Sequence, residues 1–125
     1  MFESIDVGPK RPGHPISGVV RKGGQVLTVQ TPTDSATGKL VDGGIETQVR
    51  QVFHKLDRAM QAAGGTLADV MLVQVYLTDP ADWAPMHAIW TETFADPYPA
   101  RATVVVKQLM LEGMRIEIVV NANLG

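Results

Sequence analysis

The hydrophobic residues of this chain follow a strand-like pattern first and a helical period afterwards. The segment ISGVVRKGGQVLTVQTP, which starts at Ile16, is centred on Lys22-Gly23-Gly24, where glycine supplies the positive φ that hairpin turns need. It predicts two short strands joined as a β-hairpin. Residues 31–44 are polar and rich in turn-forming residues, which indicates a long loop.

The next apolar residues recur at helical spacing, while charged residues occupy the opposite side. This arrangement predicts an amphipathic helix of about four turns. Its apolar positions are Ile45, Val49, Val52, Phe53, Leu56 and Met60. Gly64-Gly65 ends the helix, as glycine commonly does.

A second helix and three more strands complete the pattern. Residues 70–78 are short, apolar and rich in β-branched side chains, which predicts a strand with both faces largely covered. Asp79-Pro80 breaks that strand, and Asp82 is the expected N-cap of a helix that a later pair of prolines stops. The stripe of this helix consists of Trp83, Met86 or His87, Trp90 and Phe94. Residues 102–109 and 115–122 predict the last two strands.

The elements therefore follow the order ββαβαββ within one domain over residues 1–125. Residues 1–13 mix proline with glycine, which disfavours helix and central strand, so we expect an extended leader there. Two helices with apolar stripes and one sheet with an apolar face predict a two-layer α+β sandwich. The other sheet face also carries apolar residues, over 70–78 and 115–122, which predicts burial against further copies in a closed oligomer.

Composition narrows the classes of function. The charged fraction of 19% is below the roughly 25% usual for soluble domains, as expected if an oligomer hides some surface. The net charge is −2 and the cationic residues are scattered, so nucleic-acid binding has no electrostatic basis. The absence of cysteine excludes disulfides, thiolate zinc sites and a cysteine nucleophile. No apolar run approaches the ~20 residues of a membrane span, so we expect a soluble, cytoplasmic protein.

Arg101 is the first candidate for chemistry. It stands between a double-proline turn and an apolar strand, where a charge is less expected than in a loop. A stiff, extended chain could aim its guanidinium at a ligand carboxylate, which the planar fork matches in a bidentate pair. The alternative is an edge-strand arginine that reaches water or pairs with a neighbouring acid.

Glu117 is the second candidate. It alternates with Ile116 and Ile118, so it points away from the apolar face of its strand. If the opposite face is a subunit interface, partial desolvation could tune the carboxyl group for proton transfer to or from water. In a monomer, the same residue would be a solvated glutamate on an exposed face.

The histidines provide no metal site, because none of them pairs with an acid at helix-face spacing. His87 lies on or beside an aromatic stripe, where a lone histidine is more often a hydrogen-bonded packing residue than a ligand or a catalyst. Gly43-Gly44 and Gly64-Gly65 lack the spacing of a phosphate-binding or dinucleotide-binding loop. No cofactor is therefore indicated.

Three pieces of the sequence carry a family resemblance. They are Pro99-Ala100-Arg101 before a valine-rich strand, Ile116-Glu117-Ile118 near the C-terminus, and GGIETQVRQVFHKLDRAMQAAGGTLADVMLVQVYLTD. Taken together, these pieces show that the chain resembles the YjgF/RidA family. The resemblance extends from about Gly13 to Ala122. The resemblance implies the chorismate-mutase-like fold, with two helices on one mixed sheet, assembled as a homotrimer with clefts between subunits.

The same resemblance implies cofactor-independent hydrolysis of small carboxylate-bearing enamines and imines, such as 2-aminoacrylate and 2-iminobutyrate, to 2-keto acids and ammonia. Arg101 would bind the substrate carboxylate, helped by Thr103 and the strand that follows Arg101. Glu117 would position or activate water. Ile16, Val29 and His87 would line the cleft.

This chain departs from the family pattern around that cleft. Ile16 stands where a tyrosine is common, Val29 where a glycine is frequent, and His87 where an asparagine is common. These changes leave two alternatives open. One is a non-catalytic trimer that binds small carboxylates or regulates a partner, and the other is a pathway-specific deaminase or hydrolase with a bulkier substrate.

Overall fold

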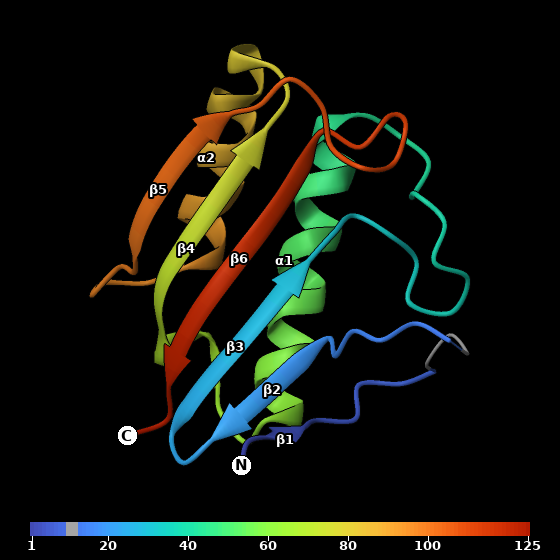
Figure 1. Ribbon diagram of the computed structural model, residues 1–125. Helices are drawn as coiled ribbons and strands as arrows, with labels where there is room; N and C mark the ends of the chain where they lie inside the picture. The colour runs from blue at the N-terminus through green and yellow to red at the C-terminus, as the bar shows by residue number, and fades with distance from the viewer. Residues whose placement is uncertain (10–12) are drawn as a thin grey trace.

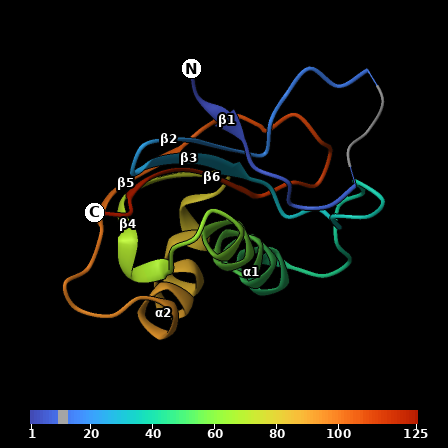
Figure 2. The same ribbon diagram turned by 90° about the horizontal axis from the view of Figure 1, so that it is seen from below.

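The computed structural model describes residues 1–9 and 13–125 as one six-stranded sheet with two helices on one of its faces. Figure 1 shows the sheet in front of both helices, and Figure 2 shows that the two helices lie on the same side of it. The predicted two-layer α+β fold is confirmed. In the described part of the chain, no helix is long and apolar enough to cross a membrane.

The elements occur in the predicted order, with one added strand at the start. The strands are β1 Glu3–Ser4, β2 Val19–Lys22, β3 Gln25–Gln30, β4 Val70–Leu77, β5 Ala100–Val105 and β6 Ile116–Asn123. The helices are α1 Ile45–Ala62 and α2 Trp83–Thr93, with short 3-10 turns at Leu67–Asp69 and Pro80–Asp82. The strands run in the order β1-β2-β3-β6-β4-β5. Among these described strands only β4 and β5 pair in parallel, so the sheet is mixed as predicted.

Two predicted segments, the leader and the strand β5, differ from the structure by more than one residue. The leader was expected over residues 1–13, but Glu3 and Ser4 pair with Arg21 and Val20 of β2 at the sheet edge, because an edge strand leaves backbone groups unpaired. Residues 10–12 of that leader lie outside the described residues. Strand β5 starts at Ala100 instead of 102 and stops at Val105 instead of 109, because its partner β4 ends at the opposite residue, Leu77.

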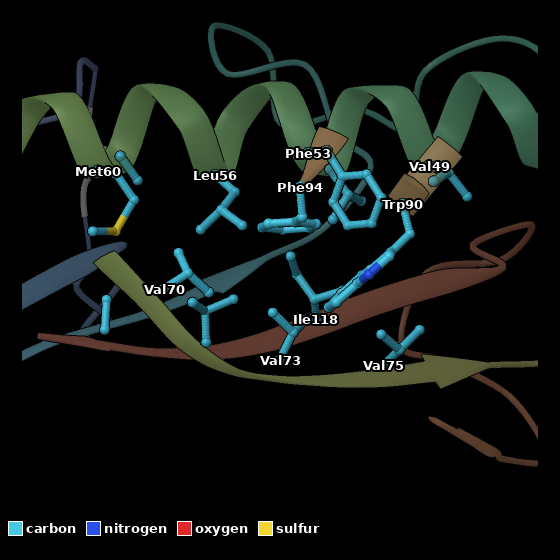
Figure 3. Close-up of a cluster of buried hydrophobic side chains, with 14 of the residues drawn as sticks. Val49, Phe53, Leu56, Met60, Val70, Val73, Val75, Trp90, Phe94 and Ile118 are labelled. Carbon is cyan, nitrogen blue, oxygen red and sulfur yellow. The ribbon is translucent and has the colours of Figure 1, made fainter. Parts of the chain in front are cut away.

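The core fills the space between the helices and the sheet (Figure 3). Strands β4 and β6 contribute alternate residues to it, since every second side chain of a strand faces the same way. The fully buried members with the largest side chains are Leu56, Met60, Leu77, Met86, Ile116 and Ile118. Phe53 of α1 meets Trp90 and Phe94 in edge-on contacts, with ring centroids 6.1 and 5.6 Å apart, which joins the two helices.

The opposite sheet face is open in a single chain. Leu27, Met71 and Val104 remain 40%, 62% and 45% exposed. The prediction that residues 70–78 are covered on both faces is therefore wrong for one chain, because both helices pack on the same side. A second layer would have to come from another molecule.

A buried ion pair fixes the start of α2. The side chain of Asp82 is 3% exposed and accepts two hydrogen bonds from Arg115, at 2.6 Å from Nη2 and 3.0 Å from Nε. Asp82 occupies the predicted N-cap position of α2, but its carboxylate is committed to Arg115 and makes no cap hydrogen bond to the helix. Gln48 of α1 accepts from the Arg115 backbone N–H at 2.7 Å, so α1, α2 and β6 meet at this point.

Candidate active site

Arg101 lies on the edge strand β5, under helix α2. It pairs with Val73 of β4, whose side chain faces the helices, so the Arg101 side chain points to that same face. Its guanidinium carbon is 4.7 Å from the ring centroid of Trp90, and its Nη2 is 3.1 Å from Nδ1 of His87. The arginine is half-buried against an aromatic surface, which is the geometry of a cation–π contact.

The buried guanidinium of Arg101 has hydrogen-bond partners for only some of its N–H groups. Burial lowers the pKa of Arg101 from its ordinary value, since a low-dielectric environment disfavours the charged form. Its Nη1 atom is buried and finds no hydrogen-bond partner anywhere in residues 1–9 and 13–125. A held cation with unsatisfied donors is suited to attract an anion.

Glu117 lies on β6 with its side chain on the open face. It pairs with Tyr76 of β4, and the flanking Ile116 and Ile118 are fully buried toward the helices. Burial raises the pKa of the Glu117 carboxyl group, because desolvation penalises the carboxylate. The predicted orientation is confirmed, and Glu117 is half-buried even in a single chain.

The six residues predicted for the site fall into two groups. Arg101, Thr103 and His87 lie at the β5 edge, and Thr103 pairs with Val75, so it shares the helix face with Arg101. Glu117, Val29 and Ile16 belong to the other group.

Within this second group, Val29 pairs with Val119 on the open face and is 48% exposed. Ile16 precedes β2 and is 68% exposed. Strands β3, β6 and β4 separate β2 from β5 (Figure 1), so one chain does not bring Arg101 and Ile16 together. Arg101 and Glu117 also use opposite faces of the sheet.

Two tryptophans take part in the site although the sequence marked them only as helix stripe. Trp90 is buried beneath the guanidinium, and Trp83 stacks on His87 with ring centroids 4.6 Å apart and an interplanar angle of 10°. Trp83, His87 and Trp90 stand at i, i+4 and i+7, which places them on one face of a helix. That spacing was visible in the sequence, but the contact of these three side chains with Arg101 depends on how β5 packs under α2.

Two hollows in the described part of the chain lie away from these residues. One, of about 630 Å³, follows the loop between β5 and β6 and is lined by residues 107–115 with Thr78. The other, of about 160 Å³, lies beside the 3-10 turn Leu67–Asp69 and the exit of α2. None of the six predicted residues lines either one. Among the described residues, no group of three or more His, Asp or Glu side chains could hold a metal ion.

Comparisons with known proteins decide the family. A family model described as Endoribonuclease L-PSP matches residues 10–124. A RutC family protein from Pyrococcus horikoshii is 38% identical over 100 residues, which cover 79% of each chain. This chain belongs to the YjgF/RidA family. A solved structure of RidA from an Antarctic Psychrobacter species agrees, with a TM-score of 0.86 and 32% identity over 97% of this chain and 98% of that one.

Names within the YjgF/RidA family differ in the function they state. A relative from Dermatophagoides farinae, 30% identical over 109 residues that cover 86% of this chain and 84% of its own, is named 2-iminobutanoate/2-iminopropanoate deaminase. A solved structure from Thermotoga maritima, with a TM-score of 0.88 and 30% identity over 98% of each chain, is described as an endoribonuclease candidate. Membership of the family therefore does not by itself specify a reaction.

Proposed function

We propose that this protein hydrolyses small carboxylate-bearing imines and enamines, of the 2-iminobutyrate and 2-aminoacrylate kind, to 2-keto acids and ammonia. The observation that carries the proposal is the Arg101 guanidinium, which is held by His87 and Trp90 and keeps unsatisfied donors. A substrate carboxylate would accept charge-assisted hydrogen bonds from the guanidinium and neutralise its charge. The deaminase name of one relative supports the same assignment.

The chemistry needs little beyond positioning. Water adds to the electrophilic imine carbon, and the resulting carbinolamine loses ammonia to leave a keto group. An enamine first takes a proton on carbon to become the imine. Glu117 is the acid/base group of the proposal: it removes a proton from the attacking water and returns one to the departing nitrogen. Its raised pKa brings the carboxyl group closer to the range in which both transfers are efficient.

The proposed site lies between copies of the chain. Arg101 and Glu117 use opposite faces of one sheet, so the Arg101 side of one copy would meet the Glu117 side of the next. The exposed apolar residues of the open face support such packing, since leaving them in water is costly. A closed homotrimer repeats this contact three times, and light scattering in solution tests it.

The test of the function uses 2-iminobutyrate generated freshly in the assay. We expect the protein to accelerate release of both ammonia and 2-oxobutyrate above the rate in buffer. A non-catalytic carboxylate binder would instead be stabilised thermally by 2-oxobutyrate and produce no acceleration. An RNA substrate serves as the comparison arm. We expect no cleavage of it, because the net charge of −2 gives no attraction to phosphates.

Replacing Glu117 by glutamine separates the role of the carboxyl group in turnover from its effect on the stability of the fold. Because burial raises its pKa, the folded chain binds this proton more tightly than the unfolded chain does. Its contribution to stability therefore falls as pH rises from its ordinary value of 4.5 through the raised pKa. At pH 7 we expect Glu117→Gln to abolish most turnover while its Tm equals or exceeds that of the wild type.

Melting curves at pH 4 and pH 7, together with the ammonia assay, check this prediction. The advantage in Tm should shrink at pH 4, where the carboxyl group is mostly protonated in both states. Full activity in the glutamine variant would remove Glu117 from the mechanism.

A further inference from the structure

An aromatic strip on α2 runs along the guanidinium of Arg101. The strip consists of the rings of Trp83, His87 and Trp90, which follow one another at i, i+4 and i+7 on one face of the helix. The Arg101 guanidinium carbon is 4.7 Å from the ring centroid of Trp90 and 5.8 Å from that of Trp83. The carboxylate anchor of the proposed function therefore lies beside both tryptophans.

The two tryptophans of the strip have different surroundings. Trp90 is 5% exposed and packs edge-on against Phe53 of the core. Trp83 is 43% exposed and does not belong to the hydrophobic core between the helices and the sheet, of which Trp90 is a member. Within the described residues, the ring contacts of Trp83 are the stack on His87 and the approach of Arg101. Core packing therefore does not account for a tryptophan at this position.

The indole of Trp83 is held in place although much of it is exposed. Trp83 is the first residue of α2, and the residue before it, Asp82, is bound to Arg115 through two hydrogen bonds. The indole also lies nearly parallel to the imidazole of His87, with ring centroids 4.6 Å apart. A flat surface that is fixed before binding loses little conformational entropy when a second flat group stacks on it.

A carboxylate bound to Arg101 brings the rest of its molecule to the exposed indole of Trp83. In a bidentate pair the carboxylate carbon lies roughly 4 Å from the guanidinium carbon. The side chain of a 2-imino acid begins two bonds from that carbon, and the centre of a phenyl group on it lies roughly 5 Å away. Aromatic rings pair at centroid separations of about 4.5–7 Å. A phenyl side chain therefore reaches the Trp83 ring, whereas the ethyl group of 2-iminobutyrate is too short to cover it.

We propose that Trp83 is a specificity-determining residue, and that the preferred substrates of this site are 2-imino acids with a planar aromatic side chain, which stacks on Trp83 while Arg101 holds the carboxylate. The proposal rests on the proposed function. Hydrolysis follows the same steps: water adds to the imine carbon, ammonia leaves, and an aromatic 2-keto acid remains. An aliphatic side chain would gain burial alone, whereas an aromatic one also gains the interaction between the two rings.

The test compares three imino acids that differ only in the side chain: 2-imino-3-phenylpropanoate, its cyclohexyl analogue and 2-iminobutyrate. Each is generated freshly in the assay, and kcat/KM is measured from the release of ammonia. We expect the wild type to favour the phenyl compound over the cyclohexyl compound by about fivefold, and over 2-iminobutyrate by about tenfold or more. A ratio measured on one preparation does not depend on the fraction of protein that is active.

Trp83→Leu is the decisive variant, because leucine keeps an apolar side chain and removes the planar surface. We expect it to lower the phenyl-to-cyclohexyl ratio to about one, while Trp83→Phe, which keeps a ring, should retain a ratio above one. Tyr98→Ala is the matched control, since Tyr98 is 56% exposed and makes no ring contact within the described residues. Its ratio should equal that of the wild type. A wild-type ratio in Trp83→Leu, or an equal loss in Tyr98→Ala, would overturn the role of Trp83.

Binding of the keto-acid products keeps this proposal separate from the proposed function. Calorimetric titration measures Kd for phenylpyruvate and for 2-oxobutyrate without turnover. If no imine is hydrolysed but phenylpyruvate binds about tenfold more tightly, and Trp83→Leu removes that difference, the deaminase proposal fails and the aromatic preference stands. If all three imines are hydrolysed with equal kcat/KM, the deaminase proposal stands and the aromatic preference fails.

The competing occupant of the Trp83 surface is an apolar side chain of a neighbouring copy, such as Ile16, which is 68% exposed. In that case Trp83→Leu would change the oligomeric state seen by light scattering and leave the phenyl-to-cyclohexyl ratio at the wild-type value, which refutes the proposal. If the leucine variant does not fold, Trp83→Met takes its place with the same expected ratios, since methionine is also apolar and has no ring.

Discussion

Replacing Arg101 by alanine is expected to lower kcat/KM for 2-iminobutyrate by about 100-fold or more while the protein stays folded. The guanidinium would make two charge-assisted hydrogen bonds to the substrate carboxylate, each worth roughly 1.5–3 kcal/mol. Losing about 3 kcal/mol of transition-state binding corresponds to about a 100-fold slower reaction. Steady-state release of ammonia and keto acid measures the effect, and circular dichroism checks the fold.

The fold should tolerate this change because Arg101 is not a well-satisfied core residue. Its Nη1 atom has no partner among the described residues, and the side chain lies at a sheet edge. Arg101→Lys keeps the charge but loses the planar fork, so we expect partial activity. Arg50→Ala is the matched control, since Arg50 is 58% exposed and pairs with Glu92 away from Arg101. Equal rates for Arg101→Ala and Arg50→Ala would refute the assignment of the anchor.

The fold could be predicted from the sequence where local periodicity decides the structure. The apolar positions from Ile45 to Met60 define α1, and alternation around Glu117 defines the two faces of β6. The features that the sequence did not predict depend on distant partners. Strand β1 exists because β2 has a free edge, and β5 ends where β4 ends.

The candidate site divides in the same way. The alternation of Ile116, Glu117 and Ile118 predicted which face of the sheet Glu117 occupies. The position of Arg101 after two prolines marked that residue as unusual. The contact of Arg101 with His87 and Trp90 did not follow, because it depends on the packing of β5 under α2. Asp82 illustrates the same limit. A carboxylate before a helix predicts a cap, yet a partner 33 residues away takes it.

The ion pair between Asp82 and Arg115 also helps to hold the elements around the candidate site in place. Asp82 directly precedes Trp83, the first residue of α2, and that helix carries His87 and Trp90 over Arg101. Arg115 begins the approach to β6, which carries Glu117. The pair therefore ties α2, which packs over Arg101, to β6, which carries Glu117.

Replacing Asp82 by alanine is expected to lower the free energy of unfolding by about 2–4 kcal/mol, because it leaves Arg115 without the carboxylate it binds through two nitrogens. The loss should stay below the largest values known for buried pairs, since the Arg115 side chain is 38% exposed and can regain water. Urea denaturation at matched protein concentration measures it, so that assembly contributes equally to each variant.

Glu92→Ala provides the control for that measurement, because it breaks an arginine–carboxylate pair of similar length, 3.1 Å, whose side chains are 58% and 60% exposed. Exposed pairs contribute at most about 1 kcal/mol, so the Glu92 variant should unfold close to the wild type. The difference between the two variants measures how much more a buried pair with two hydrogen bonds contributes than an exposed pair with one. Equal losses for Asp82→Ala and Glu92→Ala would mean that the Asp82–Arg115 contact does not fix α2 to β6.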